Sequence, residues 1–479
     1  MKNFGIAILL GLAVLCGCSA AYRSEHPEDL EFTPLAFELP QVETFQLANG
    51  VRVFFREDHE LPLVSVTTML NAGKIDEPEN RSGLAELHAT AMRSAGAGDM
   101  TADEIDAYLE MVAADLSVAS DAYATTMSLS LQSADVEQGL QILGDMMRRP
   151  RFDAQRVELA RRRMLENIRR QNDRPAVVAR RAFLSALYRN HSLGRLPTLD
   201  SVGTITLEDL RAFHKRFFKP DNLWVAVSGD IDRAALEGYL NDALGDWSGR
   251  FDRPKDSETL PPPAPPALWL AYKDVPQTTL LMGERGIDKN DPDLYALRVL
   301  DFILGGGSFN SRLMQNIRTR RGLAYSVYSY FQVGRRLPGV FIAGAETKNS
   351  SVSEVTRLMR QEMQTLMQTP VTQEELKTAK ESLVNSFVFA FEDTHEVVTR
   401  VMRLAFYGYP DEYLSRYRQR LAAVTAGDVL AVARRHLHPE AQTLIMVGNP
   451  EQPDDIADAL GLPLKTVDLE GFSSEGESN

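Results

Sequence analysis

The feature that most constrains the fold is an internal repeat with a constant offset of 219 residues. The repeated features are a four-residue box, a proline, a glycine and an alanine, which pair as Thr206–Asp209 with Thr425–Asp428, Pro220 with Pro439, Gly229 with Gly448, and Ala160 with Ala379. Two unrelated domains with similar ends would not keep one register over such a span. The repeat therefore predicts a duplicated fold.

Within each half, alternating segments precede and follow long helical patterns. Asn49-Gly50 lies between two alternating segments and predicts a hairpin, and residues 63–70 predict a further strand. Residues 82–95 predict a helix with Ser82 as its N-cap. This order favours an α+β class, with two homologous, duplicated α/β-sandwich domains. Each is expected to be a mostly antiparallel sheet with helices packed on one face, joined by a Pro-rich linker.

Prolines and composition set the expected boundaries. Pro261–Pro263 and Pro265–Pro266 cannot continue a helix or a central strand. The predicted segments are a lipoprotein signal peptide (1–18), a tether (19–40), an N-terminal domain (41–249), a linker (250–267), a C-terminal domain (268–466) and a disordered tail (467–479).

The N-terminus reads as a targeting segment. Its apolar stretch, residues 6–15, is too short for a stable bilayer span. Leu15-Cys16-Gly17-Cys18 is typical of a bacterial lipoprotein box, in which the Cys18 thiol takes a diacylglyceryl group. Both cysteines of the chain fall here, so the mature protein has no internal disulfide. Ser19 favours the outer over the inner membrane, and we expect a lipid-anchored protein on the periplasmic face.

The charge balance disfavours nucleic acid as a partner. The formal net charge is −14, whereas proteins that bind phosphate backbones carry basic surfaces. Hydrophobic residues make up 44% and charged residues 25% of the chain, as in ordinary soluble globular proteins.

The candidate chemistry lies in residues 303–330. A helical pattern stops at Gly305-Gly306-Gly307-Ser308, a second one covers Arg312 to Arg318, and alternating residues follow from Tyr325. One turn separates Arg318 from Tyr325 and can fold both side chains toward the same space. A guanidinium and a phenol aimed together suit a carbonyl oxygen that gains negative charge. Taken singly, each feature is ordinary, since a glycine run usually stops a helix.

The run GGGSFNSRL…IRTRRGLAYSVYS resembles the C-terminal half of the pitrilysin/insulinase family of inverted-motif zinc metallopeptidases, especially its processing-peptidase branch. The resemblance extends from about residue 42 to about residue 449 and implies two similar halves packed as a shell. It also implies that Arg318 and Tyr325 bind substrate beside a zinc held by the other half of the assembly. Gly305, Gly306 and Gly307 would let backbone approach the peptide closely.

The same resemblance implies a zinc helix with the motif His-x-x-Glu-His, in which two imidazoles grip the metal and the glutamate acts on its water. Here Glu86 takes the first histidine position, Ala89 the base position and Thr90 the second histidine position, while Glu166 stands where the third ligand would be. His88 points about 200° away from Glu86 on a helix and is expected to be a packed or surface histidine. We therefore expect no metal in this chain.

These observations predict the non-zinc subunit of a heteromeric metalloendopeptidase, inactive alone. Its expected partners are a homologous zinc-bearing subunit and a peptide or unfolded-protein substrate. One alternative is a peptide-binding or scaffold lipoprotein without catalysis. Another is an independent peptidase that uses Glu86 and Glu166 with water, although carboxylates and a threonine are poor zinc ligands compared with imidazole.

Two further expectations concern single segments. The alternating residues from Leu116 to Thr126 could offer a sheet edge to an extended peptide. His436 and His438 alternate as in an exposed strand or a chain end, and none of the other histidines forms a metal-ligand pattern.

Overall fold

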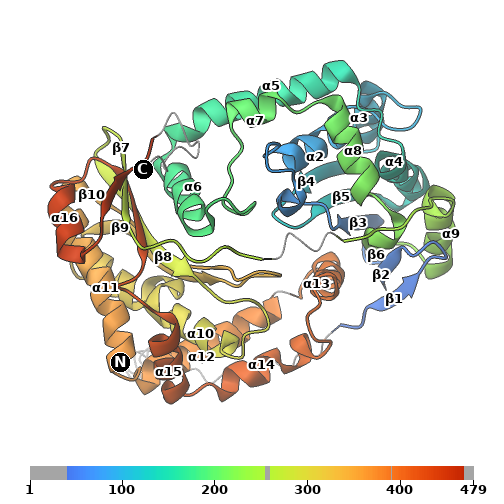
Figure 1. The fold of residues 1–479 in the computed structure, drawn as a ribbon. Helices are drawn as coiled ribbons and strands as arrows, with labels where there is room; N and C mark the ends of the chain where they lie inside the picture. The colour runs from blue at the N-terminus through green and yellow to red at the C-terminus, as the bar shows by residue number, and fades with distance from the viewer. Residues whose placement is uncertain (1–39, 254–258, 390, 469–479) are drawn as a thin grey trace, which may run out of the picture. The chain divides into compact units, whose positions relative to one another are not determined.

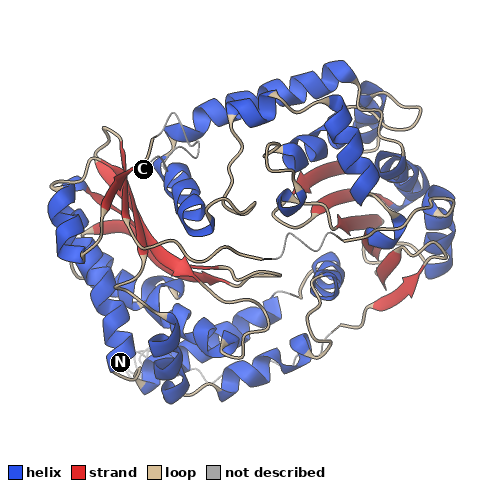
Figure 2. Ribbon diagram, viewed as in Figure 1, coloured by secondary structure: helices blue, strands red, loops and turns tan. Residues whose placement is uncertain are grey.

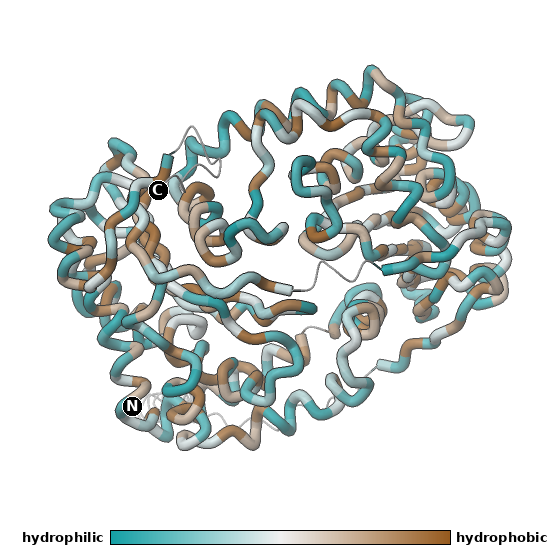
Figure 3. The backbone as a smooth tube through the Cα atoms, viewed as in Figure 1, coloured by the Kyte–Doolittle hydropathy of each residue, from teal (hydrophilic) through white to brown (hydrophobic). Residues whose placement is uncertain are grey.

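Each half of the chain contributes one six-stranded sheet to the described part of the protein (Figure 1). The structure is a computed structural model that describes residues 40–253, 259–389 and 391–468. Figure 2 shows the two sheets in red with helices against them, and hydrophobic residues are frequent along the strands of both (Figure 3). The predicted α+β class is confirmed.

The first sheet has the strand order β1-β2-β6-β3-β5-β4 and the second the order β12-β7-β11-β8-β10-β9. The strands of the first are β1 (Glu43–Gln46), β2 (Arg52–Glu57), β3 (Leu63–Leu70), β4 (Asp115–Ser120), β5 (Thr125–Gln132) and β6 (Leu223–Gly229). Those of the second are β7 (Leu268–Tyr272), β8 (Gln277–Arg285), β9 (Ala324–Gln332), β10 (Val340–Lys348), β11 (Thr443–Gly448) and β12 (Leu464–Thr466).

The helices follow the same division by sequence. The first half contains α2 (Leu84–Ser94), α3 (Ala102–Met111), α4 (Val136–Arg148), α5 (Ala154–Arg170), α6 (Pro175–Tyr188), α7 (Leu199–Gly203), α8 (Leu207–Phe217) and α9 (Arg233–Leu244). The second contains α10 (Leu294–Asp301), α11 (Val352–Gln368), α12 (Gln373–Phe389), α13 (Thr394–Phe406), α14 (Tyr413–Ala423), α15 (Ala426–His436) and α16 (Pro453–Leu460). None of the helices in the described residues is long and apolar enough to traverse a bilayer.

The two sheets share one topology. The order β2-β6-β3-β5-β4 in the first matches β7-β11-β8-β10-β9 in the second. In both, the first pair is parallel and the following pairs are antiparallel. The edge strands differ, because β1 pairs antiparallel with β2 whereas β12 pairs parallel with β7. The duplication predicted from the repeat is therefore visible in the strand pairing.

The structure explains why several residues of the repeat recur. Thr206 and Thr425 each cap a helix, α8 and α15, in a reciprocal box with an aspartate three residues later. The hydroxyl of Thr206 accepts from the backbone N–H of Asp209 at 3.1 Å, and the Asp209 carboxylate accepts from the N–H of Thr206 at 2.7 Å. Gly229, at the end of β6, has φ +130°, and a Cβ there would lie 2.1 Å from the Leu63 carbonyl oxygen, so the position requires glycine.

The halves exchange one helix each. α6, from the first half, packs on the second sheet, where Val178, Ala182 and Phe183 meet strand residues of β8, β10 and β11. α13, from the second half, packs on the first sheet through Val398 and Met402 (Figure 1). These helices begin at Pro175 and Thr394, again 219 residues apart. The exchange is reciprocal, so each sheet needs the other half to cover one face.

Strand β2 illustrates how the exchange of helices buries both faces of the first sheet. Val53 and Phe55 point into the core shared with the first half's own helices, whereas Phe54 points to the face covered by α13. Because both faces are buried in the middle of β2, its three central residues, Val53 to Phe55, are all apolar. His395 fixes α13 further, since its ring nitrogens bond the hydroxyls of Ser228 at 3.0 Å and Thr67 at 2.8 Å.

Several local predictions are decided by the structure. The hairpin at Asn49-Gly50 is confirmed, with Gly50 at φ +102°. The N-cap prediction is wrong: Gly83 is the N-cap of α2, and the buried Glu77 carboxylate accepts from the backbone N–H groups of Gly83 (3.1 Å) and Ala85 (2.9 Å) in place of Ser82.

The described residues include the start of the predicted tail but not the predicted signal segment. Val467, assigned to the tail, is buried and donates from its backbone to the carbonyl of Leu270 at 2.9 Å. Residues 469–479, together with Cys18 and the whole signal segment, lie outside the described residues.

Candidate functional site

Two π-helices lie in this region: η7 (Phe302–Gly306), which includes the first two glycines of the run, and η9 (Met314–Thr319), which follows it. Their widened turns close with bonds from Gly307 N to the Phe302 carbonyl (2.8 Å) and from Arg320 N to the Gln315 carbonyl (3.0 Å). The helix expected to stop at the glycines thus continues through two of them. π-helical turns are rare and occur frequently at functional sites.

Arg318 and Tyr325 are brought together, as predicted. The guanidinium carbon of Arg318 lies 5.0 Å from the centre of the Tyr325 ring and 5.1 Å from that of Phe309. Both rings are largely open to solvent, at 74% and 58%. Within the described chain, neither an ion pair nor a hydrogen bond occupies the guanidinium of Arg318. The half-buried Arg318 and the two exposed rings form a surface cluster, here called the Arg318 cluster, in which the N–H donors of the guanidinium remain available.

Phe309 is the member of the Arg318 cluster that the sequence did not reveal. It follows Ser308, a non-glycine residue at φ +52°, and turns outward with the loop. Gln315 holds this loop by donating from Nε2 to the Phe309 carbonyl at 2.6 Å. No periodicity links Phe309 to Arg318, so only the three-dimensional path of the loop could identify it.

The helix that carries Arg318 is anchored to its neighbours. Arg312 makes a bidentate pair with Glu375 of α12, at 2.7 and 2.9 Å. Asn316 donates to Glu362 of α11 at 2.6 Å. Because these contacts anchor the residues just before η9 and the middle of η9, Arg318 is presented from a rigid support.

The three glycines differ in their surroundings. Gly305 and Gly307 are buried, and only Gly306 is exposed. A Cβ on Gly305 would lie 2.2 Å from the backbone nitrogen of Ser329 in β9, and one on Gly307 would lie 2.6 Å from the Phe302 carbonyl oxygen. Close packing of η7 on β9 therefore explains Gly305, and the close approach of Gly307 to Phe302 of η7 explains Gly307. The role of the glycines in substrate binding stays a prediction.

Helix α2 carries the positions at which a zinc motif was sought. Glu86 and Thr90 lie on its exposed side, one turn apart, and the Thr90 hydroxyl donates to the Glu86 carbonyl at 3.0 Å. Ala89 is buried at 2% exposure. Glu86 borders a cavity of about 230 Å³ together with Lys74 and other residues. Partial burial raises the pKa of Glu86, and the Lys74 ammonium opposes that change.

The Glu166 carboxylate forms ion pairs with two arginines of its own helix. Its carboxylate pairs with Arg170 at 2.7 Å and with Arg169 at 3.6 Å. These are ordinary pairs between residues three and four apart on an exposed helix face.

Comparison with known families decides the affiliation. A profile described as "Insulinase (Peptidase family M16)" matches residues 52–199, and one described as "Peptidase M16 inactive domain" matches residues 204–383. The chain belongs to the insulinase family.

The relatives and the solved structures agree with this affiliation. An uncharacterized zinc protease of Mycobacterium leprae is 28% identical over 397 residues, which cover 82% of this chain and 88% of that protein. A protein of Helicobacter pylori named a non-peptidase homolog is 24% identical and covers 94% of this chain and all of its own length. The crystal structure of a peptidase M16 inactive domain from Pseudomonas fluorescens superposes with a TM-score of 0.76 at 27% identity, covering 86% of this chain and 98% of that one.

The residues of α2 do not fit the zinc site of the insulinase family. That site requires two imidazoles one helical turn apart and a carboxylate base between them. Glu86 offers a carboxylate, Thr90 a hydroxyl already bonded to the backbone, and Ala89 a methyl group. No chemical step can therefore be assigned to a metal at this position of the chain.

His88 packs in the core, as one of its two expected places. It is fully buried among Phe152, Phe213 and Phe218. Its Nε2 lies 3.2 Å from Nδ1 of His214, whose Nε2 lies 3.0 Å from the Met147 carbonyl. Since that carbonyl can only accept, His214 donates from Nε2 and accepts from His88. Burial lowers the pKa of His88 well below its usual value and that of His214 to about 4.

This pair predicts an acid-sensitive core. Between pH 6.5 and about 4 the unfolded chain binds protons at His88 and His214 that the folded chain does not, so the free energy of unfolding falls as the pH falls. His214 alone should account for about 3 kcal/mol by pH 4. Urea unfolding at pH 7, 5.5 and 4.5 measures this loss of stability. In the double variant His88→Leu/His214→Leu, the free energy of unfolding should depend less steeply on pH than in the wild type.

His59 supplies the control. It is exposed, and hydrogen bonds that the Asp230 and Glu57 carboxylates accept from it raise its pKa, so His59→Gln should not flatten the acid side of the curve. Equal slopes for the wild type and the double variant would contradict the assignment.

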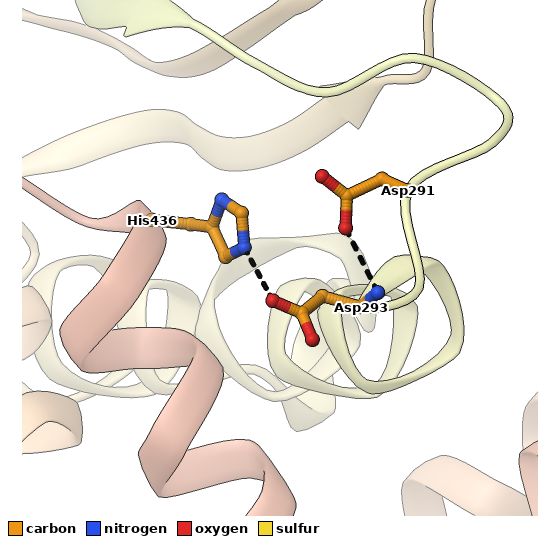
Figure 4. Close-up of side chains that lie close together, drawn as sticks. All are labelled: Asp291, Asp293 and His436. Atoms are coloured by element: carbon orange, nitrogen blue, oxygen red, sulfur yellow. Dashed lines mark hydrogen bonds and ion pairs between the residues drawn. The ribbon is translucent and has the colours of Figure 1, made fainter.

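One group of side chains in the described residues has the types and spacing of metal ligands: Asp291, Asp293 and His436 (Figure 4). Its members already satisfy one another. Asp291 accepts from the backbone N–H of Asp293 at 2.8 Å, and His436 Nε2 bonds the Asp293 carboxylate at 2.7 Å. Arg435 pairs with the same carboxylate oxygen and so supplies the positive charge there. The group ties the end of α15 to the start of α10 and includes neither Glu86 nor Glu166.

The two histidines expected in an exposed strand or chain end are placed otherwise. His436 is the last residue of α15 and is mostly buried against Asp293. His438 follows that helix, and its Nδ1 pairs with Glu284 of β8 at 2.6 Å. The prediction for His436 is wrong because it considered neighbours in sequence, whereas Asp293 lies 143 residues away.

Proposed function

We propose that this chain is the non-zinc subunit of a heteromeric zinc metalloendopeptidase. The observation that supports it is the Arg318 cluster, in which a half-buried guanidinium lies against two exposed rings and has no partner for its charge in the described chain. It occurs in a chain whose positions for zinc hold Glu86, Ala89 and Thr90. Zinc in a homologous partner subunit would activate the attacking water.

In this proposal, Arg318 and Tyr325 act on the peptide. The Arg318 guanidinium donates to the carbonyl oxygen of the scissile bond as that oxygen becomes negative, and the Tyr325 phenol donates from the other side of the same space. Phe309 keeps the guanidinium directed outward by stacking on it. Gly306, the exposed glycine of the run, leaves room for peptide backbone beside the cluster.

A sheet edge could hold an extended substrate. β4 ends the strand order of the first sheet, so one side of its backbone has no neighbouring strand in that sheet. The stretch considered from sequence was longer, from Leu116 to Thr126. Thr125 and Thr126 lie in β5, which pairs with both β3 and β4, so only Asp115–Ser120 is at the edge.

We further propose that the protein is anchored by lipid at Cys18 on the periplasmic face of the bacterial envelope, with the outer membrane favoured by Ser19. The basis is the lipoprotein box of the sequence. Labelling with a radioactive fatty acid, compared between wild type and Cys18→Ser, tests the attachment.

The decisive experiment is reconstitution. The purified full-length chain in detergent is assayed for metal content and peptidase activity alone and after mixing with a zinc-motif homologue from the same genome. We expect no zinc and no activity alone, and activity on mixing that exceeds that of the homologue by itself. Stoichiometric zinc with activity in the isolated chain would refute the proposal.

The second candidate is a peptide-binding or scaffold protein without catalysis. The observation in its favour is the relative in Helicobacter pylori that is named a non-peptidase homolog. Failure of the mixture to gain activity, together with binding of unfolded protein by the isolated chain, would decide for this candidate.

A further inference from the structure

A pocket of about 310 Å³ lies in the second half, where α10 and η7 meet β9 and α12. Its charged lining includes Arg298 and Arg335, and its apolar walls include Phe302, Phe331, Leu383 and Tyr409. All six residues are half-buried, so the pocket is enclosed by protein yet open to solvent. The volume is within the range of small-ligand sites.

Arg298 is the unusual member of this lining. Its Nη1 donates to the Tyr417 hydroxyl at 3.2 Å, and its guanidinium lies 5.4 Å from the centre of that ring. Its Nε is buried and has no hydrogen-bond acceptor. Within the described residues no carboxylate lies at ion-pair distance from it. A half-buried charge without a counter-charge is costly, and an incoming anion would remove that cost.

The other charged groups of the pocket are already engaged. Arg335 pairs with Asp121 at 3.0 Å and with the Tyr407 hydroxyl at 3.1 Å. Asp301 accepts from the Ser329 hydroxyl at 2.8 Å and makes no ion pair with Arg298. Arg298 is thus the one cation of the lining that forms no ion pair, although its charge acts on Asp301 from a longer distance and opposes the rise that burial causes in the pKa of that carboxyl.

We propose that this pocket binds a carboxylate borne on an aromatic or branched apolar group, either as a free acid or as the C-terminal residue of a peptide. The guanidinium of Arg298 receives the carboxylate, for which its planar N–H groups are well matched. Phe302, Phe331 and Leu383 enclose the apolar part. The lining shares Gly306 with the glycine run but includes none of Phe309, Arg318 and Tyr325, and the inference does not depend on the proposed peptidase function.

Calorimetric titration of the full-length chain tests the proposal with three probes: N-acetyl-L-phenylalanine, its C-terminal amide, and a hexapeptide that ends in phenylalanine with a free carboxylate. We expect a Kd on the order of 1 mM or tighter for the free acid. The amide should bind about 10- to 100-fold more weakly, because it lacks the charge. The hexapeptide then distinguishes the two kinds of ligand. If it binds at least as tightly as the free acid, the pocket takes the C-terminal residues of peptides. If it does not bind, the pocket takes small free acids. Equal affinity for acid and amide overturns the proposal.

Variants locate the binding. Arg298→Gln should weaken the free acid at least 10-fold, whereas Arg357→Gln, at an exposed position of α11 outside the pocket, should leave affinity unchanged. Because Arg298 also contacts Tyr417, its loss could lower stability. Leu383→Trp therefore provides a second measurement, since it fills the pocket from α12 and keeps the guanidinium. Unchanged affinity in both Arg298→Gln and Leu383→Trp refutes the assignment.

Discussion

Replacing Arg318 by alanine should lower kcat/KM of the assembled peptidase by about 10²–10³-fold, the usual loss when one preorganised donor to a developing oxyanion is removed. The loss should fall on kcat more than on KM, since the donor is needed when the carbonyl oxygen becomes charged. The measurement is steady-state turnover of a quenched fluorescent peptide by the reconstituted pair. Peptide affinity without the zinc subunit should change little.

Two matched variants complete this test. Arg320→Ala removes an exposed arginine two residues away whose guanidinium bonds Asn316 at 3.0 Å, and it should retain nearly full turnover. Tyr325→Phe removes the phenol oxygen and keeps the ring that faces Arg318, so its loss should be smaller than that of Arg318→Ala. Should Arg318→Ala retain wild-type turnover, the role given to the Arg318 cluster is wrong.

Gly305→Ala should destabilise the chain by about 2–3 kcal/mol, a large effect for one methyl group. The added Cβ would lie 2.2 Å from the backbone nitrogen of Ser329 and 2.6 Å from its hydroxyl. Backbone cannot move aside as a flexible side-chain end does, so η7 must shift away from β9. Urea unfolding monitored by circular dichroism measures the change.

The control for this variant is Gly238→Ala in α9. Nothing lies within 4 Å of the added Cβ there, and alanine is the better helix former, so stability should rise by about 0.5–1 kcal/mol. If Gly305→Ala is as stable as wild type but weakens peptide binding, the glycine serves substrate access and not packing.

The duplicated architecture could be predicted because it leaves local signals. The boxes at Thr206 and Thr425 cap helices through side chain to backbone bonds within three residues, and Gly229 ends a strand with a positive φ. Such signals depend on neighbours in sequence. The proximity of Arg318 and Tyr325 could likewise be predicted from the sequence, because one turn joins the two elements that carry them.

The remaining features depend on contacts that no periodic pattern in the sequence indicates. Nothing local to Pro175–Tyr188 indicates that this helix covers the sheet of the other half. The grouping of His436 with Asp293 and the place of Phe309 beside Arg318 have the same origin. A cap made by Glu77, six residues before Gly83, also replaced the adjacent Ser82. In each case, no sequence pattern marks the residue that makes the deciding contact.

The exchange of α6 and α13 has a consequence for how the chain is made. Strands β1 to β6 are complete by Gly229, but α13 begins only at Thr394, so a growing or translocating chain exposes one apolar face of its first sheet for more than 160 further residues. Such a surface invites aggregation until it is covered. A chain cut within residues 250–267 would be expected to hold together as two interlocked fragments, since each supplies a missing piece of the other's core.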